Sequence, residues 1–241
     1  MLVAVASVKG APGVTRLAMA LAALWPHSGS ATLVEADAVG GTIAGRFGLA
    51  ASPSLTTLAA AMFPSVQDAR ISEHTQLLSG QLPVVVAPTD PAGVRAAVAD
   101  LAAAGGLLEY VADEPEAVVV LDCGRLDLGH LSPALTVAGE VLLVVHPVPE
   151  ELGLLDVAVR SLRAEGGRVR LILRGAGYDA SEMSRTFGVE VAGRLPEAPE
   201  TGLFARSRRT AYTRSVQQIA LGITDRAQRS APVVAVPEVE A

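Results

Sequence analysis

Residues 7–16, which read Ser-Val-Lys-Gly-Ala-Pro-Gly-Val-Thr-Arg, have the types and spacing of a phosphate-binding loop. Glycines let the backbone turn tightly, so successive N–H groups can point toward one anion. The ammonium of Lys9 is a compact charge that can contact one phosphate oxygen in such a loop. Lys9 is also the only lysine in the chain, because every other strongly basic residue is arginine. This usage favours a specific role for Lys9.

Such a loop requires a strand before it and a helix after it. Residues 2–6, Leu-Val-Ala-Val-Ala, predict a buried strand, and residues 14–25 predict a helix that ends before Pro26. The amino terminus of this helix adds roughly half a positive charge at the turn. The three elements therefore predict an anion site at the first turn of the fold. The alternative is an ordinary strand-to-helix turn with an accidental lysine.

Two carboxylates follow apolar runs that read as strands. Asp37 comes after residues 31–35, and Asp122 comes after residues 117–121. Because the carboxyl ends of parallel strands meet at one edge of a sheet, we expect both side chains near the loop. Asp122 can serve magnesium through water, and Asp37 can orient a water molecule. Asp37 could instead only cap the segment that follows it.

The loop resembles the deviant Walker A motif of the MinD/ParA family of ATPases, Lys-Gly-Gly-x-Gly-Lys-Thr. Lys9 matches the signature lysine, Gly10 and Gly13 match loop glycines, and Thr15 matches the magnesium-binding hydroxyl. Val14 stands where the family has its second lysine, and Pro12 removes one backbone N–H. The resemblance covers roughly residues 1–225, and it is strongest at the loop and at Asp122.

Further residues are matched by the same resemblance. Glu35 and Asp37 stand at the family's Asp-x-Asp, and Asp122-Cys123-Gly124 is similar to its Asp-x-x-Gly switch, with the glycine one place early. Arg174 ends the run Leu-Ile-Leu-Arg where family members often have an adenine-reading Asn. It could stack on a base or simply face solvent.

The resemblance implies a site for ATP or ADP with Mg²⁺. Its nucleotide contacts would be Lys9, Gly10, Ala11, Pro12, Gly13, Val14, Thr15, Arg16, Arg174 and Pro196. Thr15 and Asp122 would serve the metal. The implied catalytic residues are Asp37, near the attacking water, and Lys9, which would reach the nucleotide of a partner subunit.

Apolar runs alternate with helical stretches along the whole chain. Further strands are expected at residues 82–87, 140–145, 169–173 and 189–193, and further helices at 54–62, 92–104, 150–164 and 210–229. Val/Leu/Ile runs without polar alternation indicate strands that are covered on both faces. The pattern predicts an α/β three-layer sandwich with a mostly parallel sheet, and the resemblance implies a P-loop NTPase (SIMIBI-like) fold.

We expect one nucleotide-binding domain over residues 1–229 and a disordered acidic tail over residues 230–241. The net charge of −6 argues against a broad nucleic-acid surface. Cys123 is the only cysteine, which permits no internal disulfide and fits a cytoplasmic location; we expect it to be a small buried neighbour. No signal peptide, membrane span or basic membrane anchor is expected.

The resemblance implies an ATP-dependent homodimer switch that hydrolyses ATP slowly and positions a cargo such as a chromosome, plasmid, pilus or secretion apparatus. An activator or cargo protein would be its partner. Loss of the second lysine at Val14 weakens phosphate binding by about ten- to a hundredfold. The alternative is therefore a non-hydrolysing scaffold that keeps the fold and the dimer face.

A third reading is non-specific DNA binding. It depends on the densest basic cluster, which consists of Arg206, Arg208, Arg209 and Arg214. The same cluster could instead be the solvated start of a helix.

Overall fold

The structure is a computed structural model and describes residues 1–9, 13–26, 31–63, 65–78, 81–114, 117–196 and 210–230. Over these residues the chain forms an eight-stranded sheet with the order β3-β4-β2-β5-β1-β6-β7-β8. The strands are β1 (Leu2–Ser7), β2 (Thr32–Glu35), β3 (Gln76–Leu78), β4 (Leu82–Val85), β5 (Val119–Arg125), β6 (Glu140–Val145), β7 (Val169–Arg174) and β8 (Glu190–Leu195). All neighbours pair in parallel except β3, which is antiparallel to β4. The predicted α/β class is confirmed.

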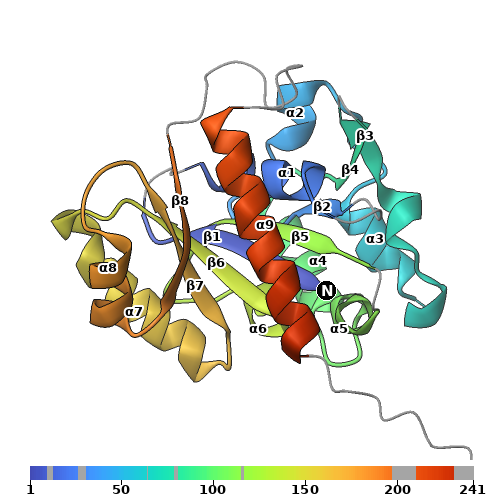
Figure 1. The fold of residues 1–241 in the computed structure, drawn as a ribbon. Helices are drawn as coiled ribbons and strands as arrows, with labels where there is room; N and C mark the ends of the chain where they lie inside the picture. The colour runs from blue at the N-terminus through green and yellow to red at the C-terminus, as the bar shows by residue number, and fades with distance from the viewer. Residues whose placement is uncertain are drawn as a thin grey trace, which may run out of the picture.

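Helices cover both faces of the sheet, and α9 crosses in front of it in Figure 1. One face packs against α1 (Val14–Ala23), α2 (Ile43–Phe47) and α9 (Ala211–Ser230). The other face packs against α3 (Leu55–Ala61), α4 (Pro91–Leu101), α5 (Leu107–Asp113), α6 (Pro133–Val137), α7 (Pro149–Ala164) and α8 (Ala180–Phe187). Two 3₁₀ turns, Val66–Asp68 and Ile71–His74, follow α3.

The central strand β1 shows why its sequence is apolar throughout. Val3 and Val5 belong to the core beneath α1 and α9, whereas Leu2 and Ala4 belong to the core on the opposite face. Because successive strand residues point to opposite faces, a strand buried on both faces has no position for a solvated side chain. The predicted coverage of both faces is confirmed.

The structure corrects the end of one strand. The sequence predicted that a strand ends at Leu121 and that Asp122 follows it, but β5 continues to Arg125. Asp122 pairs in register with Val5 on one side and Glu35 on the other. Both backbone edges of Asp122 therefore lie against neighbouring strands, which keeps this polar residue within the sheet.

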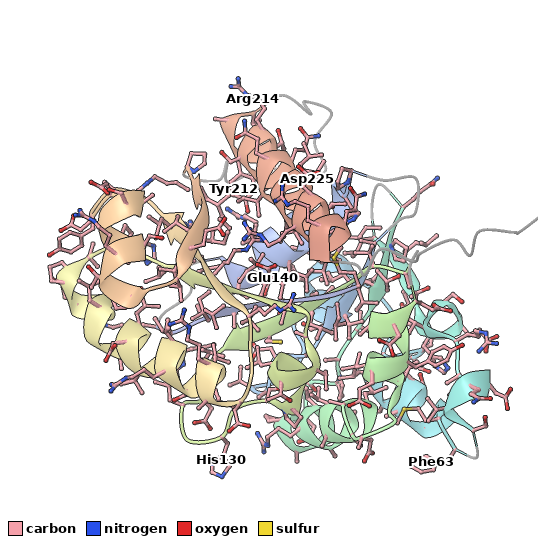
Figure 2. The ribbon with its side chains drawn as sticks, turned by 60° about the horizontal axis from the view of Figure 1, so that its bottom comes forward. Phe63, His130, Glu140, Tyr212, Arg214 and Asp225 are labelled. Carbon is pink, nitrogen blue, oxygen red and sulfur yellow. The ribbon has the colours of Figure 1, made fainter. Side chains whose placement is uncertain are left out.

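Parts of the sequence-based predictions fall on residues that the structure does not describe. They are the loop residues Gly10, Ala11 and Pro12, the basic residues Arg206, Arg208 and Arg209, and the tail beyond α9 at 231–241. Arg214 is described: it is exposed on the first turns of α9 and points away from the body of the molecule (Figure 2). None of the described helices is long and apolar enough to cross a membrane.

Candidate functional site

A pocket of about 580 Å³ opens at the carboxyl edge of the central strands, beside the first turn of α1. Its walls come from the ends of β1, β5 and β7, from the segment that follows β2, and from helices α1 and α2. The lining residues are Ser7, Gly13, Val14, Thr15, Arg16, Asp37, Val39, Arg46, Gly124, Arg125 and Arg174. This edge is where a parallel α/β sheet binds ligands.

Gly13 begins the helical side of the pocket. Its φ of 85° lies in the left-handed region, which strongly favours glycine. The backbone then enters α1, and the carbonyl of Gly13 accepts the first helical hydrogen bond from Leu17 at 2.9 Å. The N–H groups of this first helical turn have no partner within the helix, so they and the helix dipole favour an anion here.

Thr15 and Asp122 meet beneath this turn. The Thr15 hydroxyl lies close enough to the Asp122 carboxyl group to lower its pKa by hydrogen bonding, and the Gly124 N–H donates a hydrogen bond to Oδ1 at 3.3 Å. Asp122 is 1% exposed, and its burial raises the pKa of the carboxyl group to about 7 despite these bonds. Nearby Asp37 and Glu35 raise this pKa further through charge repulsion. A hydroxyl beside a buried carboxylate is a donor set that suits Mg²⁺.

The described chain does not gather a full set of metal-ligating side chains. It contains no group of three or more His, Cys, Asp or Glu side chains that could hold a metal ion. Mg²⁺ in nucleotide sites is usually bound by one or two protein groups together with phosphates and water. The Thr15–Asp122 pair therefore fits a metal that arrives with a phosphate ligand.

Asp37 lies directly against the backbone of β5. A Cβ atom added to Gly124 would lie 2.0 Å from Oδ2 of Asp37, so this contact requires glycine, whose φ is also positive at 58°. Burial raises the pKa of Asp37, whereas a hydrogen bond from the Val39 N–H and the charge of Arg125 lower it. Asp37 thus caps the turn that follows it, through Oδ1 at 3.1 Å, and also lines the pocket.

Glu35 is a buried positioning residue for this side of the pocket. Its Oε1 accepts hydrogen bonds from the N–H groups of Thr42 and Ile43 at 2.6 and 2.9 Å. Its Oε2 accepts another from the N–H of Ala87 at 2.9 Å. These bonds tie the start of α2 and the segment after β4 to the end of β2, and so hold the turn that carries Asp37.

Four arginines from four different elements line the pocket. Arg16 comes from α1, Arg46 from α2, Arg125 from β5 and Arg174 from β7. Tyr212, buried at the start of α9, lies near two of them: burial raises its pKa to about 12, and the charges of Arg16 and Arg174 act against this rise. The pocket therefore combines a helix amino terminus with several guanidinium groups.

The sequence predicted only some of the residues that line the pocket. It identified Arg16 and Arg174, but it did not assign Ser7, Arg46 or Arg125 to the site. Ser7 is 1% exposed, and its Oγ has no hydrogen-bond partner among the described residues. Its position at the end of the strand before the loop was a usable signal, whereas nothing in local spacing connects Arg46 to the loop.

Two predicted contacts are not part of the pocket as the structure describes it. Lys9 is exposed two residues after the end of β1, and Pro196 directly follows β8; neither lines the pocket. A contact from Lys9 to a partner subunit, and a contact from Pro196 to a base, therefore remain predictions. Cys123 is buried, as expected, and burial raises the pKa of its thiol, so it is a core residue.

Comparison with solved structures identifies the fold. MinD from Pyrococcus horikoshii, complexed with Mg-ADP, superposes with a TM-score of 0.73 at 16% identity, covering 96% of this chain and 99% of that one. A ParA family ATPase from Chlorobium tepidum gives 0.68 at 17% identity, covering 91% and 98%. A putative plasmid partition protein from Borrelia burgdorferi bound to AMPPNP gives 0.67 at 13%, covering 93% and 98%. No protein-family model and no curated protein matches the sequence.

Proposed function

We propose that this chain, which has the α/β fold of the MinD and ParA ATPases, binds ATP or ADP with Mg²⁺ in the pocket beside α1 and acts as a nucleotide-dependent switch. The observation that carries the proposal is that Thr15, in the first turn of α1, lies beside the buried carboxyl group of Asp122 and lowers its pKa. Two similar proteins support it, since MinD from Pyrococcus horikoshii forms a complex with Mg-ADP and the putative plasmid partition protein from Borrelia burgdorferi is bound to AMPPNP.

The backbone supplies much of the proposed phosphate binding. The N–H groups of Val14, Thr15 and Arg16 begin α1, where the helix dipole stabilises negative charge. Gly10 and Ala11 would contribute further N–H groups. Pro12 would contact the phosphate without donating a hydrogen bond, because proline has no backbone N–H. Magnesium, when bound, would neutralise phosphate charge, with Thr15 and Asp122 holding it. The sheet anchors Asp122, so its carboxylate is fixed before the ligand arrives.

Asp37 is the proposed water-orienting residue. It lines the pocket, and the contact with Gly124 fixes its carboxyl group on the β5 side. Its raised pKa comes chiefly from burial, which makes it a better proton acceptor than an exposed aspartate. The exposed ammonium of Lys9 would reach the nucleotide of a second copy of the chain, so ATP would favour a homodimer and hydrolysis would release it.

The proposed role of the switch is to position a cargo such as a chromosome, plasmid, pilus or secretion apparatus, with an activator or cargo protein as partner. Val14 favours the second candidate function, a scaffold that binds nucleotide but does not hydrolyse it. Val14 lines the pocket with an uncharged side chain, so the loop's own contribution to stabilising transferred phosphate is reduced. DNA binding through Arg214 and the basic residues before α9 is the third candidate.

Binding of Mg-ATP to the Thr15→Ala variant, measured by isothermal titration calorimetry, tests the site. We expect a loss of about tenfold or more, because the variant removes a metal-binding hydroxyl and a partner of Asp122. Thr136→Ala is the matched control, since this exposed threonine of α6 donates a hydrogen bond to the nearby carbonyl of Pro133 and does not line the pocket. Equal Mg-ATP affinity in Thr15→Ala and the native chain would refute the proposed site.

ATP hydrolysis separates the switch from the scaffold. The switch predicts slow phosphate release that Asp37→Asn and Lys9→Ala abolish, and a dimer that forms with ATP and disperses after turnover. The scaffold predicts Mg-ATP binding with no phosphate release above the buffer background. DNA binding that weakens with salt and with Arg208→Glu would support the third candidate.

A further inference from the structure

Arg174 reaches the backbone of the phosphate-binding turn. A Cβ atom added to Gly13 would lie 2.6 Å from Nη1 of Arg174 and 3.6 Å from its Cζ. The guanidinium group therefore rests on the residue that immediately precedes α1. Here the N–H groups and the helix dipole already favour an anion.

The fold holds Arg174 in this place from several sides. Arg174 is the last residue of β7, where it pairs in register with Leu195 of β8, and its side chain is partly buried. Tyr212 of α9 lies close enough for the charge of Arg174 to affect its pKa. A guanidinium fixed in this way loses less conformational entropy when it binds a ligand than a free side chain would.

Val14, at the position after Gly13, lines the same pocket but carries no charge. The loop thus lacks a cation at position 14, and Arg174 places one beside that position from a strand that is distant in sequence. A guanidinium can make two parallel hydrogen bonds to phosphate oxygens, which an ammonium cannot do. Arg16, Arg46 and Arg125 line the pocket as well and add positive charge around it.

We propose that Arg174 binds a phosphate group of the nucleotide within the same chain and supplies the charge that Val14 lacks. This inference rests on the proposed function, because it assigns a role inside the same site. It also decides between the two roles that the sequence left open for Arg174. The contact with Gly13 places the guanidinium at the phosphate end of the site, so neither adenine stacking nor free exposure to solvent is its main role.

The affinity for inorganic tripolyphosphate, with Mg²⁺, tests the inference, because this probe has phosphates but no base. Tripolyphosphate and Mg-ATP are titrated into the native chain, Arg174→Met and Arg174→Gln. We expect both ligands to bind about ten- to a hundredfold more weakly to both variants, as loss of one charge-assisted hydrogen-bonding group predicts. Arg185→Met is the matched control: this exposed arginine lies on α8 and does not line the pocket.

A second pair of variants tests whether Arg174 replaces the lysine that the chain lacks at position 14. In the Arg174→Met background, Val14→Lys should restore most of the lost tripolyphosphate affinity. In the native background, the same change should give a smaller gain, because Arg174 already supplies the charge. The two substitutions should therefore be clearly non-additive, as expected for groups that serve one ligand.

Three results would overturn the inference. Unchanged tripolyphosphate affinity in both folded Arg174 variants would show that Arg174 does not bind phosphate. Weaker ATP binding with unchanged tripolyphosphate binding would assign Arg174 to the base instead. A native chain that binds neither ligand would refute the proposed function itself, and the inference with it. Circular dichroism of each variant establishes that the fold is retained.

Discussion

At the scale of single residues, the site depends on a carboxyl group that the protein buries. Asp122 is 1% exposed and lies in the middle of the sheet, where Gly124 donates a hydrogen bond to it and both Thr15 and Gly124 lower its pKa by hydrogen bonding. These bonds do not offset the cost of burying its charge, so its pKa is raised to about 7. Without a cation beside it, the ionised carboxylate is unfavourable in this buried position. A bound metal ion would therefore stabilise the ionised carboxylate strongly.

The raised pKa of Asp122 predicts how stability depends on pH in the absence of metal. Its folded-state pKa, about 7, exceeds the ordinary aspartate value of 3.8, so the protonated form favours the folded state. This contribution is fully present below the unfolded-state pKa and is lost as the pH rises through the folded-state pKa. Asp122→Asn cannot ionise, so it should lose less stability than the native chain between about pH 5 and about pH 8.

Urea unfolding in EDTA, at several pH values between about 5 and about 8, measures the difference in stability between the native chain and Asp122→Asn. The native chain should lose up to roughly 1.4 kcal/mol per pH unit more than the variant over the steepest part of the range. Asp156→Asn is a suitable control, because Asp156 is exposed and forms a surface pair with Arg160 at 2.7 Å. Parallel pH profiles for the native chain and Asp122→Asn would mean that this carboxyl group does not titrate as described.

At the scale of elements, the sequence predicted the long strands and helices well, because each has a continuous apolar run. It missed β3, which has three residues, with the exposed Leu77 at the edge of the sheet. It also missed the short helices α2, α5, α6 and α8, whose lengths of five to eight residues give little periodicity.

The candidate site was predictable where it is local in sequence and not where tertiary folding assembles it. Gly13 and Thr15 belong to a motif, and Asp37 and Asp122 follow from strand ends, although β5 extends past Asp122. Arg46 enters the pocket only because α2 is folded back against it. No spacing rule connects this arginine with a loop some thirty residues earlier, since the connection is made by the fold.

Glu35 ties α2 to the sheet, and this predicts a stability effect. Glu35→Gln replaces a carboxylate that accepts bonds from the N–H groups of Thr42, Ile43 and Ala87. One amide NH₂ group must then face a backbone donor, so we expect a loss of about 1–3 kcal/mol in urea unfolding. Glu73→Gln, at an exposed glutamate, should change little. A Glu35→Gln variant as stable as the native chain would contradict this role.

At the scale of the whole molecule, the sheet has different chemistry at its two edges. The amino edge carries a cavity of about 830 Å³, beside which Arg170 pairs with Glu140 and with Glu190, the latter at 3.7 Å. Arg226 of α9 also contacts Glu190, at 2.5 Å. Figure 2 shows Glu140 on the sheet close to α9. These ion pairs join three strands and the last helix, far from the pocket at the carboxyl edge.

Arg170→Met separates stability from ligand binding. Arg170 is 5% exposed, so its removal leaves the largely buried Glu140 without its partner and should cost about 3–5 kcal/mol. The double variant Arg170→Met/Glu140→Leu should recover much of this loss, because the unpaired charge is gone. Thermal unfolding measures both effects. Mg-ATP affinity below the unfolding transition should not change, and a large change would show that the two edges are coupled.

The dependence of ATP affinity on magnesium tests the central claim most directly. ATP is titrated into the native chain and Thr15→Ala, each with excess Mg²⁺ and with EDTA. The account predicts that the native chain binds ATP much more weakly in EDTA and that Thr15→Ala loses most of this difference, because Thr15 and Asp122 together hold the metal. An ATP affinity of the native chain that is the same with and without magnesium, or an equal magnesium effect in Thr15→Ala, would contradict the account.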